Sequence, residues 1–139
     1  MFQQVLLAAD GSKHSIRAAE KAVQLVKTQA NSLVEVIYVI NSSTSKADVL
    51  HCDDPKQIEQ TRKEKLRDII HLFNIEGIKH QVKILRGEPG PTVVQYANDK
   101  NFDCLVIGSR GLNALQSMVL GSVSHKVAKR VKCPVMIVK

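Results

Sequence analysis

The stretch Gly108-Ser109-Arg110-Gly111, followed after nine residues by Gly121-Ser122-Val123-Ser124, decides the fold of this 139-residue chain. It comes after the apolar run of residues 104–107 and precedes a helical pattern that ends near Val131. A strand, a glycine-rich loop and a helix N-terminus in this order can hold phosphate groups. Glycines let the backbone approach an anion closely, and the first-turn amides of a helix point toward it. The hydroxyl groups of Ser122 and Ser124 would add donors, so the stretch predicts an anion-binding loop.

Apolar runs and helical patterns alternate along the whole chain. Strands are expected at residues 5–9, 33–40, 79–86, 103–107 and 134–138, and helices at residues 15–28, from Pro55 to before Gly77, after the turn at 87–91, and at 122–131. All strands but the third are nearly continuous apolar runs, as in a parallel sheet that is covered on both faces. With right-handed crossovers, this order predicts a doubly wound α/β sheet in one domain spanning residues 1–139.

The positions of two strands decide where a ligand would bind. The more polar third strand suits an edge of the sheet, whereas the sequence alone does not fix the order of the others. If the first and fourth strands are neighbours where the winding reverses, the loops that follow them meet in one crevice. Those loops are Asp10-Gly11-Ser12 and residues 108–121. Residues 41–54 are polar and serine-rich and are expected to form a loop.

The formal net charge is +7, and no acidic residue follows Asp103. The basic C-terminal third fits either a solvated helix face with a charged tail or a positive field around an anionic ligand. Nucleic acid is a third possibility, but the chain has no Trp and only five Phe and Tyr residues to stack on bases. An odd count of three distant cysteines, with no signal peptide or membrane-spanning run, favours the cytoplasm.

The last strand, Val135–Val138, suggests an oligomer. It is short and apolar and is expected at an edge of the sheet, where an uncovered apolar strand invites association. A twofold partner that pairs this strand with its own copy would cover it. The sequence therefore predicts a homodimer through Val135–Val138, with coverage by the chain's own loops or tail as the alternative.

These residues resemble the universal stress protein family along essentially the whole chain. The resemblance includes Ala8-Ala9-Asp10-Gly11-Ser12 after the first strand and Cys133-Pro134-Val135 at the last one. Its discriminating element is the pattern Gly-x2-Gly-x9-Gly-Ser, which is intact here as Gly108, Gly111, Gly121 and Ser122. Family members with this pattern form the ATP-binding branch, and those without it generally bind no nucleotide.

The resemblance implies a five-stranded sheet in the order 3-2-1-4-5, adenine-nucleotide alpha-hydrolase-like, and a homodimer through the last strand. It also implies ATP as the ligand, with Mg²⁺ carried by the phosphates and by water. The residues that it places around the nucleotide are, on the base and ribose side, Ala8, Ala9, Asp10 and Val39; at the ribose and phosphates, Ile107, Gly108, Arg110 and Gly111; and at the phosphates, Gly121, Ser122, Val123 and Ser124.

Each of these residues also has a purely structural interpretation. Asp10 could cap the first helix, and Ser122 could serve as the N-cap of the last one without any phosphate. Arg110 could be a solvated loop residue. His14 and His125, at helix starts near the expected crevice, are interpreted as surface helix residues rather than general bases.

The leading functional prediction is a regulatory nucleotide-binding protein and not an efficient enzyme. The loop lacks the lysine of the common Gly-x4-Gly-Lys-Ser/Thr motif, so ATP turnover is expected to fall far below the roughly 1–100 s⁻¹ of kinases. A nucleotidyl transferase would need a His-x-Gly-His motif after the first strand, where the chain has Asp10-Gly11-Ser12-Lys13-His14. The remaining alternatives are a nucleotide-free dimeric interaction module and a nucleic-acid binder whose affinity depends strongly on salt.

Overall fold

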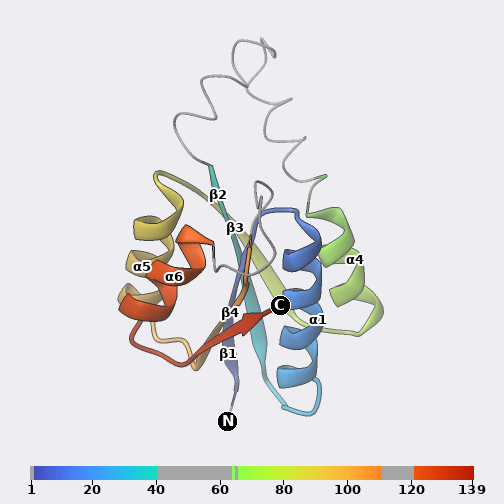
Figure 1. Cartoon of the computed structure of the whole chain (residues 1–139). Coiled ribbons are helices and arrows are strands. Elements are labelled where there is room, and N and C mark those ends of the chain that lie inside the picture. Colours follow the sequence, from blue (N-terminus) through green and yellow to red (C-terminus); the bar gives the residue numbers. More distant parts are fainter. Residues whose placement is uncertain (1, 41–63, 65, 111–120) are drawn as a thin grey trace.

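The computed structural model describes residues 2–40, 64, 66–110 and 121–139. Strands and helices alternate through these residues (Figure 1). Their order is β1 (Gln4–Ala9), α1 (Lys13–Val26), β2 (Leu33–Ile40), α4 (Arg67–Ile75), β3 (His80–Arg86), α5 (Pro89–Asp99), β4 (Cys104–Gly108), α6 (Ser122–Arg130) and β5 (Val135–Val138). The loop expected at residues 41–54 and the helix start expected at Pro55 lie outside the described residues.

The strands form one five-stranded parallel sheet in the order β3-β2-β1-β4-β5. This confirms the predicted architecture, including β1 and β4 as neighbours at the point where the winding reverses. The polar strand β3 and the short apolar strand β5 occupy the two edges, as expected. The loops after β1 and β4 consequently start side by side, with Ala8 paired to Ile107.

Helices cover both faces of the sheet, α1 and α4 on one side and α5 and α6 on the other (Figure 1). Successive residues of each strand alternate between the two faces, so Val5 and Leu7 of β1 pack toward α1 and α4, whereas Leu6 packs toward α5 and α6. Phe73 of α4 is the largest fully buried side chain of the first core. None of the described helices is both long enough and apolar enough to cross a membrane.

The amino end of β1 is fixed by a residue at the start of β4. The Asp103 carboxylate oxygen Oδ2 accepts hydrogen bonds from the amides of Gln3 and Gln4, both at 2.9 Å, and the Asp103 amide donates to the Gln4 carbonyl at 2.7 Å. These bonds align the amino ends of β1 and β4. The register of the two strands, and so the relative position of their carboxyl ends, is thereby fixed.

Candidate functional site

The two ends of the glycine-rich segment lie together at the carboxyl edge of the sheet. The Gly121 amide donates to the Ser109 carbonyl at 2.8 Å, and the Ser109 amide donates to the Val138 carbonyl at 2.8 Å. The buried Ser124 hydroxyl donates to the Gly108 carbonyl at 2.6 Å. The first turn of α6 is therefore held directly against the end of β4.

The N-terminus of α6 has no side-chain cap. Its N-cap is Gly121, with φ −61° and ψ 155°, and among the described residues no side-chain capping bond to the first turn is found. The prediction that Ser122 would be the N-cap is wrong, because Ser122 is the first helical residue. The first hydrogen bond of the helix runs from the His125 amide to the Gly121 carbonyl at 3.0 Å.

The amides of Ser122, Val123 and Ser124 precede that bond and have no partner within the helix. They lie at the positive end of its dipole. This donor set fits an anion such as a phosphate.

Gly108 has a structural reason to be glycine that the sequence did not reveal. It is the last residue of β4, not part of the following loop, and a Cβ added to it would lie 2.7 Å from the His14 Cβ and 3.0 Å from the His14 carbonyl carbon. The first turn of α1 packs so closely on β4 that no side chain fits between them. Because His14 and Gly108 are far apart in the sequence, spacing alone could not indicate this contact.

Asp10 is held rigidly at the end of β1 by the first turn of α1. Its Oδ1 accepts hydrogen bonds from the Ser12 amide at 2.9 Å and from the Ser15 hydroxyl at 2.6 Å, and its own amide donates to the Ser15 hydroxyl oxygen at 2.8 Å. The N-cap of α1 is Ser12, which accepts from the Ser15 amide at 3.2 Å. Asp10 thus braces the capped turn without being the cap, and Gly11 between them adopts φ 83°.

Three of the predicted apolar site residues lie on one face of the sheet. Ala8 of β1, Val39 of β2 and Ile107 of β4 all pack toward α5 and α6. Ala9 faces the opposite side and joins the core beneath α1 and α4. Only its main chain is therefore suitably placed to contact a ligand bound on the α5 and α6 side.

Gly111 lies outside the described residues. Arg110 is described, and it lies close enough to His14 to influence the protonation of the imidazole. Partial burial lowers the pKa of His14 below its ordinary value, and the guanidinium groups of Arg17 and Arg110 lower that pKa further, whereas Asp10 acts in the opposite direction. The carboxyl ends of β1 and β4 thus bring together Asp10, His14 and Arg110. The family resemblance places Asp10 and Arg110 at the ligand, whereas His14 was interpreted as a surface helix residue.

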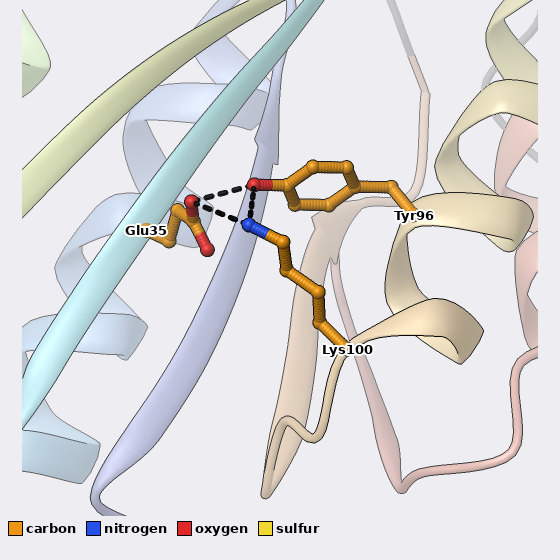
Figure 2. A network of polar contacts seen from close by, with 3 residues as sticks. All are labelled: Glu35, Tyr96 and Lys100. Atoms are coloured by element: carbon orange, nitrogen blue, oxygen red, sulfur yellow. Dashed lines mark hydrogen bonds and ion pairs between the residues drawn. The ribbon is translucent and has the colours of Figure 1, made fainter.

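A second polar cluster lies away from this edge, near the amino end of β2 (Figure 2). The Tyr96 hydroxyl donates to Glu35 Oε1 at 2.6 Å, Lys100 Nζ donates to the Tyr96 hydroxyl at 3.0 Å, and Lys100 Nζ lies 3.8 Å from Glu35 Oε1. Burial raises the pKa of Tyr96, and its bond to Glu35 adds to that rise.

Glu35 is the one charged residue in the apolar run of residues 33–40. A lone carboxylate in such a strand is itself a signal for a buried partner. Its partners are Tyr96 on α5 and Lys100, the C-cap of that helix.

Comparison with known proteins agrees with this architecture. Residues 1–139 match the universal stress protein family. The chain is 31% identical to universal stress protein YxiE of Bacillus subtilis over the full length of both chains. Among solved structures, it is similar to hypothetical protein MJ0577, with a TM-score of 0.85 and 28% identity over 100% of this chain and 96% of that one.

Another similar structure is a universal stress protein in complex with cAMP, with a TM-score of 0.71 and 25% identity over 99% of this chain and 96% of that one. The match of the family over the whole chain and the full-length relative lead to one conclusion. The chain belongs to the universal stress protein family.

Proposed function

We propose that the protein binds ATP, with Mg²⁺ carried by its phosphates, at the carboxyl ends of β1 and β4, and that it acts as a nucleotide-regulated dimer in the stress response of the cytoplasm. The observation that carries this proposal is the N-terminus of α6, which lacks a side-chain cap and which Ser124 holds against Gly108. Such a terminus supplies amide donors and a partial positive charge for a phosphate chain.

The neighbouring apolar face gives this site a place for a nucleoside. Ala8, Val39 and Ile107 project on the same side of the sheet as α6, so a base and ribose on that side can reach α6 with their phosphates. The related structure with cAMP is consistent with an adenine nucleotide. ATP itself is proposed from the intact Gly-x2-Gly-x9-Gly-Ser pattern.

In this arrangement the nucleoside and the phosphates use different groups. The side chains of Ala8, Val39 and Ile107, the Ala9 main chain and Asp10 serve the base and ribose. The phosphates use Gly108, Arg110, Gly111, Gly121, Ser122, Val123 and Ser124. The Ser124 hydroxyl already donates to Gly108, so its contribution to a phosphate is its amide. Bound ATP would supply a transferable phosphoryl group, and we propose hydrolysis that is slow at most.

Replacing Gly121 by valine is expected to abolish ATP binding while the protein stays folded. The backbone at Gly121 has φ −61°, which any residue adopts, so the substitution introduces no backbone strain. The valine side chain would instead occupy space beside the amides of α6. Calorimetric titration with ATP and Mg²⁺ measures binding, and circular dichroism measures folding. We expect the affinity to fall at least tenfold.

Glu88→Val is the matched control, because Glu88 is the N-cap of α5 and its side chain also makes no capping hydrogen bond. It should bind ATP as the unchanged protein does. The nucleotide-free interaction module remains the alternative, since Gly108 and Ser124 have structural roles without any ligand. Unchanged ATP affinity in folded Gly121→Val, or no binding to the unchanged protein, would favour that alternative.

The proposed dimer can be tested at β5. The strand β5 lies at an edge of the sheet, and its residues Val135, Met136 and Ile137 are only partly buried. Met136→Lys is expected to convert the dimer into a monomer, since it places a charge beside its symmetry copy while the lysine stem keeps much of the packing of methionine. Light scattering measures the mass. Val82→Lys on the opposite edge strand β3 is the control and should leave the mass unchanged. A monomeric unchanged protein, or a dimeric Met136→Lys, contradicts this assembly.

A further inference from the structure

His14 lies against the glycine motif without being part of it. Its Cβ is 2.7 Å from the place where a Cβ of Gly108 would lie, and Gly108 also accepts the hydrogen bond from Ser124 of α6. The imidazole is only partly buried. His14 therefore packs against Gly108, the same residue of β4 that holds the proposed phosphate-binding turn in place.

Arg17 determines which nitrogen of the His14 ring carries the proton. Arg17 Nη2 lies 2.9 Å from His14 Nδ1, and a guanidinium group can only donate hydrogen bonds. Nδ1 is therefore the acceptor, and the neutral ring carries its proton on Nε2. Arg17 Nε also donates to the main-chain oxygen of Lys139 at 3.0 Å, which fixes the guanidinium at two points. Within the described part of the chain, no acceptor is recorded for the Nε2 proton.

The charges around the ring favour an anion. Among the described residues, Arg17 and Arg110 contribute two positive charges near the ring, and Asp10 contributes one negative charge. Partial burial and the two cations also lower the pKa of His14, which favours the neutral form of the ring. A neutral ring with its proton on Nε2 offers a hydrogen-bond donor in a region of net positive charge.

We propose that His14 donates a hydrogen bond from Nε2 to the phosphate chain of the bound nucleotide, and that Arg17 is the positioning residue that fixes the ring and its tautomer. This inference rests on the proposed function. It adds a phosphate-binding residue from α1, on the other side of Gly108 from α6. The simpler interpretation of His14 as a solvated helix residue predicts the opposite results in the experiments below.

The test compares ATP with adenosine, which lacks phosphates, by calorimetry with Mg²⁺ present. His14→Ala is expected to weaken ATP binding roughly ten- to hundredfold, as for a hydrogen bond to a charged group, and to leave adenosine binding within about twofold. His14→Gln should recover part of the loss, because its amide also donates. His71→Ala, which removes an exposed histidine from α4, is the matched control and should behave as the unchanged protein does.

The role of Arg17 has its own readout in the nuclear magnetic resonance spectrum of the imidazole. In Arg17→Met the pKa of His14 is expected to rise, since a neighbouring positive charge is lost, and the ring nitrogens should no longer show a single Nε2–H tautomer. The affinity of Arg17→Met for ATP should also fall. An unchanged pKa, tautomer and ATP affinity in Arg17→Met would show that Arg17 does not position the ring.

Two further outcomes separate this inference from the proposed function. If the unchanged protein binds ATP more tightly than adenosine and folded His14→Ala keeps that preference, the role of His14 is refuted and the nucleotide site stands. If the unchanged protein binds neither compound, the proposed site fails and the role of His14 fails with it.

Discussion

Gly108→Ala should lower the free energy of unfolding by about 1–3 kcal/mol, the range seen when atoms are forced into a packed interior. The new methyl group would lie 2.7 Å from the His14 Cβ and 3.0 Å from its carbonyl carbon, and backbone atoms cannot move aside without shifting α1. Denaturation by urea measures the loss. In a chain of this length, each kcal/mol corresponds to about 3–5 °C in Tm. Gly108→Val should be more severe.

Gly90→Ala is the control for this prediction. A Cβ on Gly90 would lie 2.8 Å from Cδ of Lys126, a similar approach, but Cδ belongs to a flexible side chain that can swing away. Gly90 is also in helix α5, where alanine is favoured over glycine by up to about 1 kcal/mol. We therefore expect Gly90→Ala to be neutral or stabilising. Equal destabilisation by both substitutions would contradict the assigned role of Gly108.

Tyr96→Phe should also destabilise the protein, by about 1–3 kcal/mol, because it leaves a buried carboxylate without its shortest hydrogen bond. Glu35 is only 6% exposed, and the Tyr96 hydroxyl donates to it at 2.6 Å, whereas Lys100 Nζ remains 3.8 Å away (Figure 2). Equilibrium unfolding in urea measures the change. Lys100→Met should have a much smaller effect, since this side chain is exposed and Tyr96 still satisfies the carboxylate.

The double variant Glu35→Leu with Tyr96→Phe distinguishes a lost hydrogen bond from lost packing. It removes the carboxylate together with its donor, and an apolar pair in place of a buried polar pair is often nearly neutral. The double variant should therefore be more stable than Tyr96→Phe alone. If the losses of unfolding free energy in Glu35→Leu and Tyr96→Phe add up to the loss in the double variant, the two side chains do not act as a unit.

The sheet could be predicted from the sequence because its signals are local. Apolar runs between helical patterns indicated all five strands, and the polarity of residues 79–86 placed β3 at an edge. The strand order itself came from the family resemblance. Boundaries were less accurate: β4 begins and ends one residue later than expected, and α1 begins at Lys13 rather than at Ser15. These shifts follow from the Ser12 cap and from the pairing of Gly108 with Val138.

The candidate site could be predicted only in part, because several of its residues depend on distant contacts. Gly108 was interpreted as a loop glycine, whereas its close neighbour is His14 of α1. Ser124 was expected to offer its hydroxyl to a ligand, whereas that hydroxyl donates to Gly108. The tautomer of His14 depends on Arg17, and Arg17 depends on Lys139 at the far end of the chain. Motif spacing carries no information about such contacts.

The bond from Asp103 to the start of β1 has a consequence for the newly made chain on the ribosome. The central strand β1 can pair with β2 early, but its other neighbour, β4, begins at Cys104. Until those residues emerge, β1 is an apolar edge strand, and the amides of Gln3 and Gln4 lack their carboxylate acceptor. A nascent chain that pauses before residue 103 would therefore expose the unpaired apolar edge of β1, where other chains can associate.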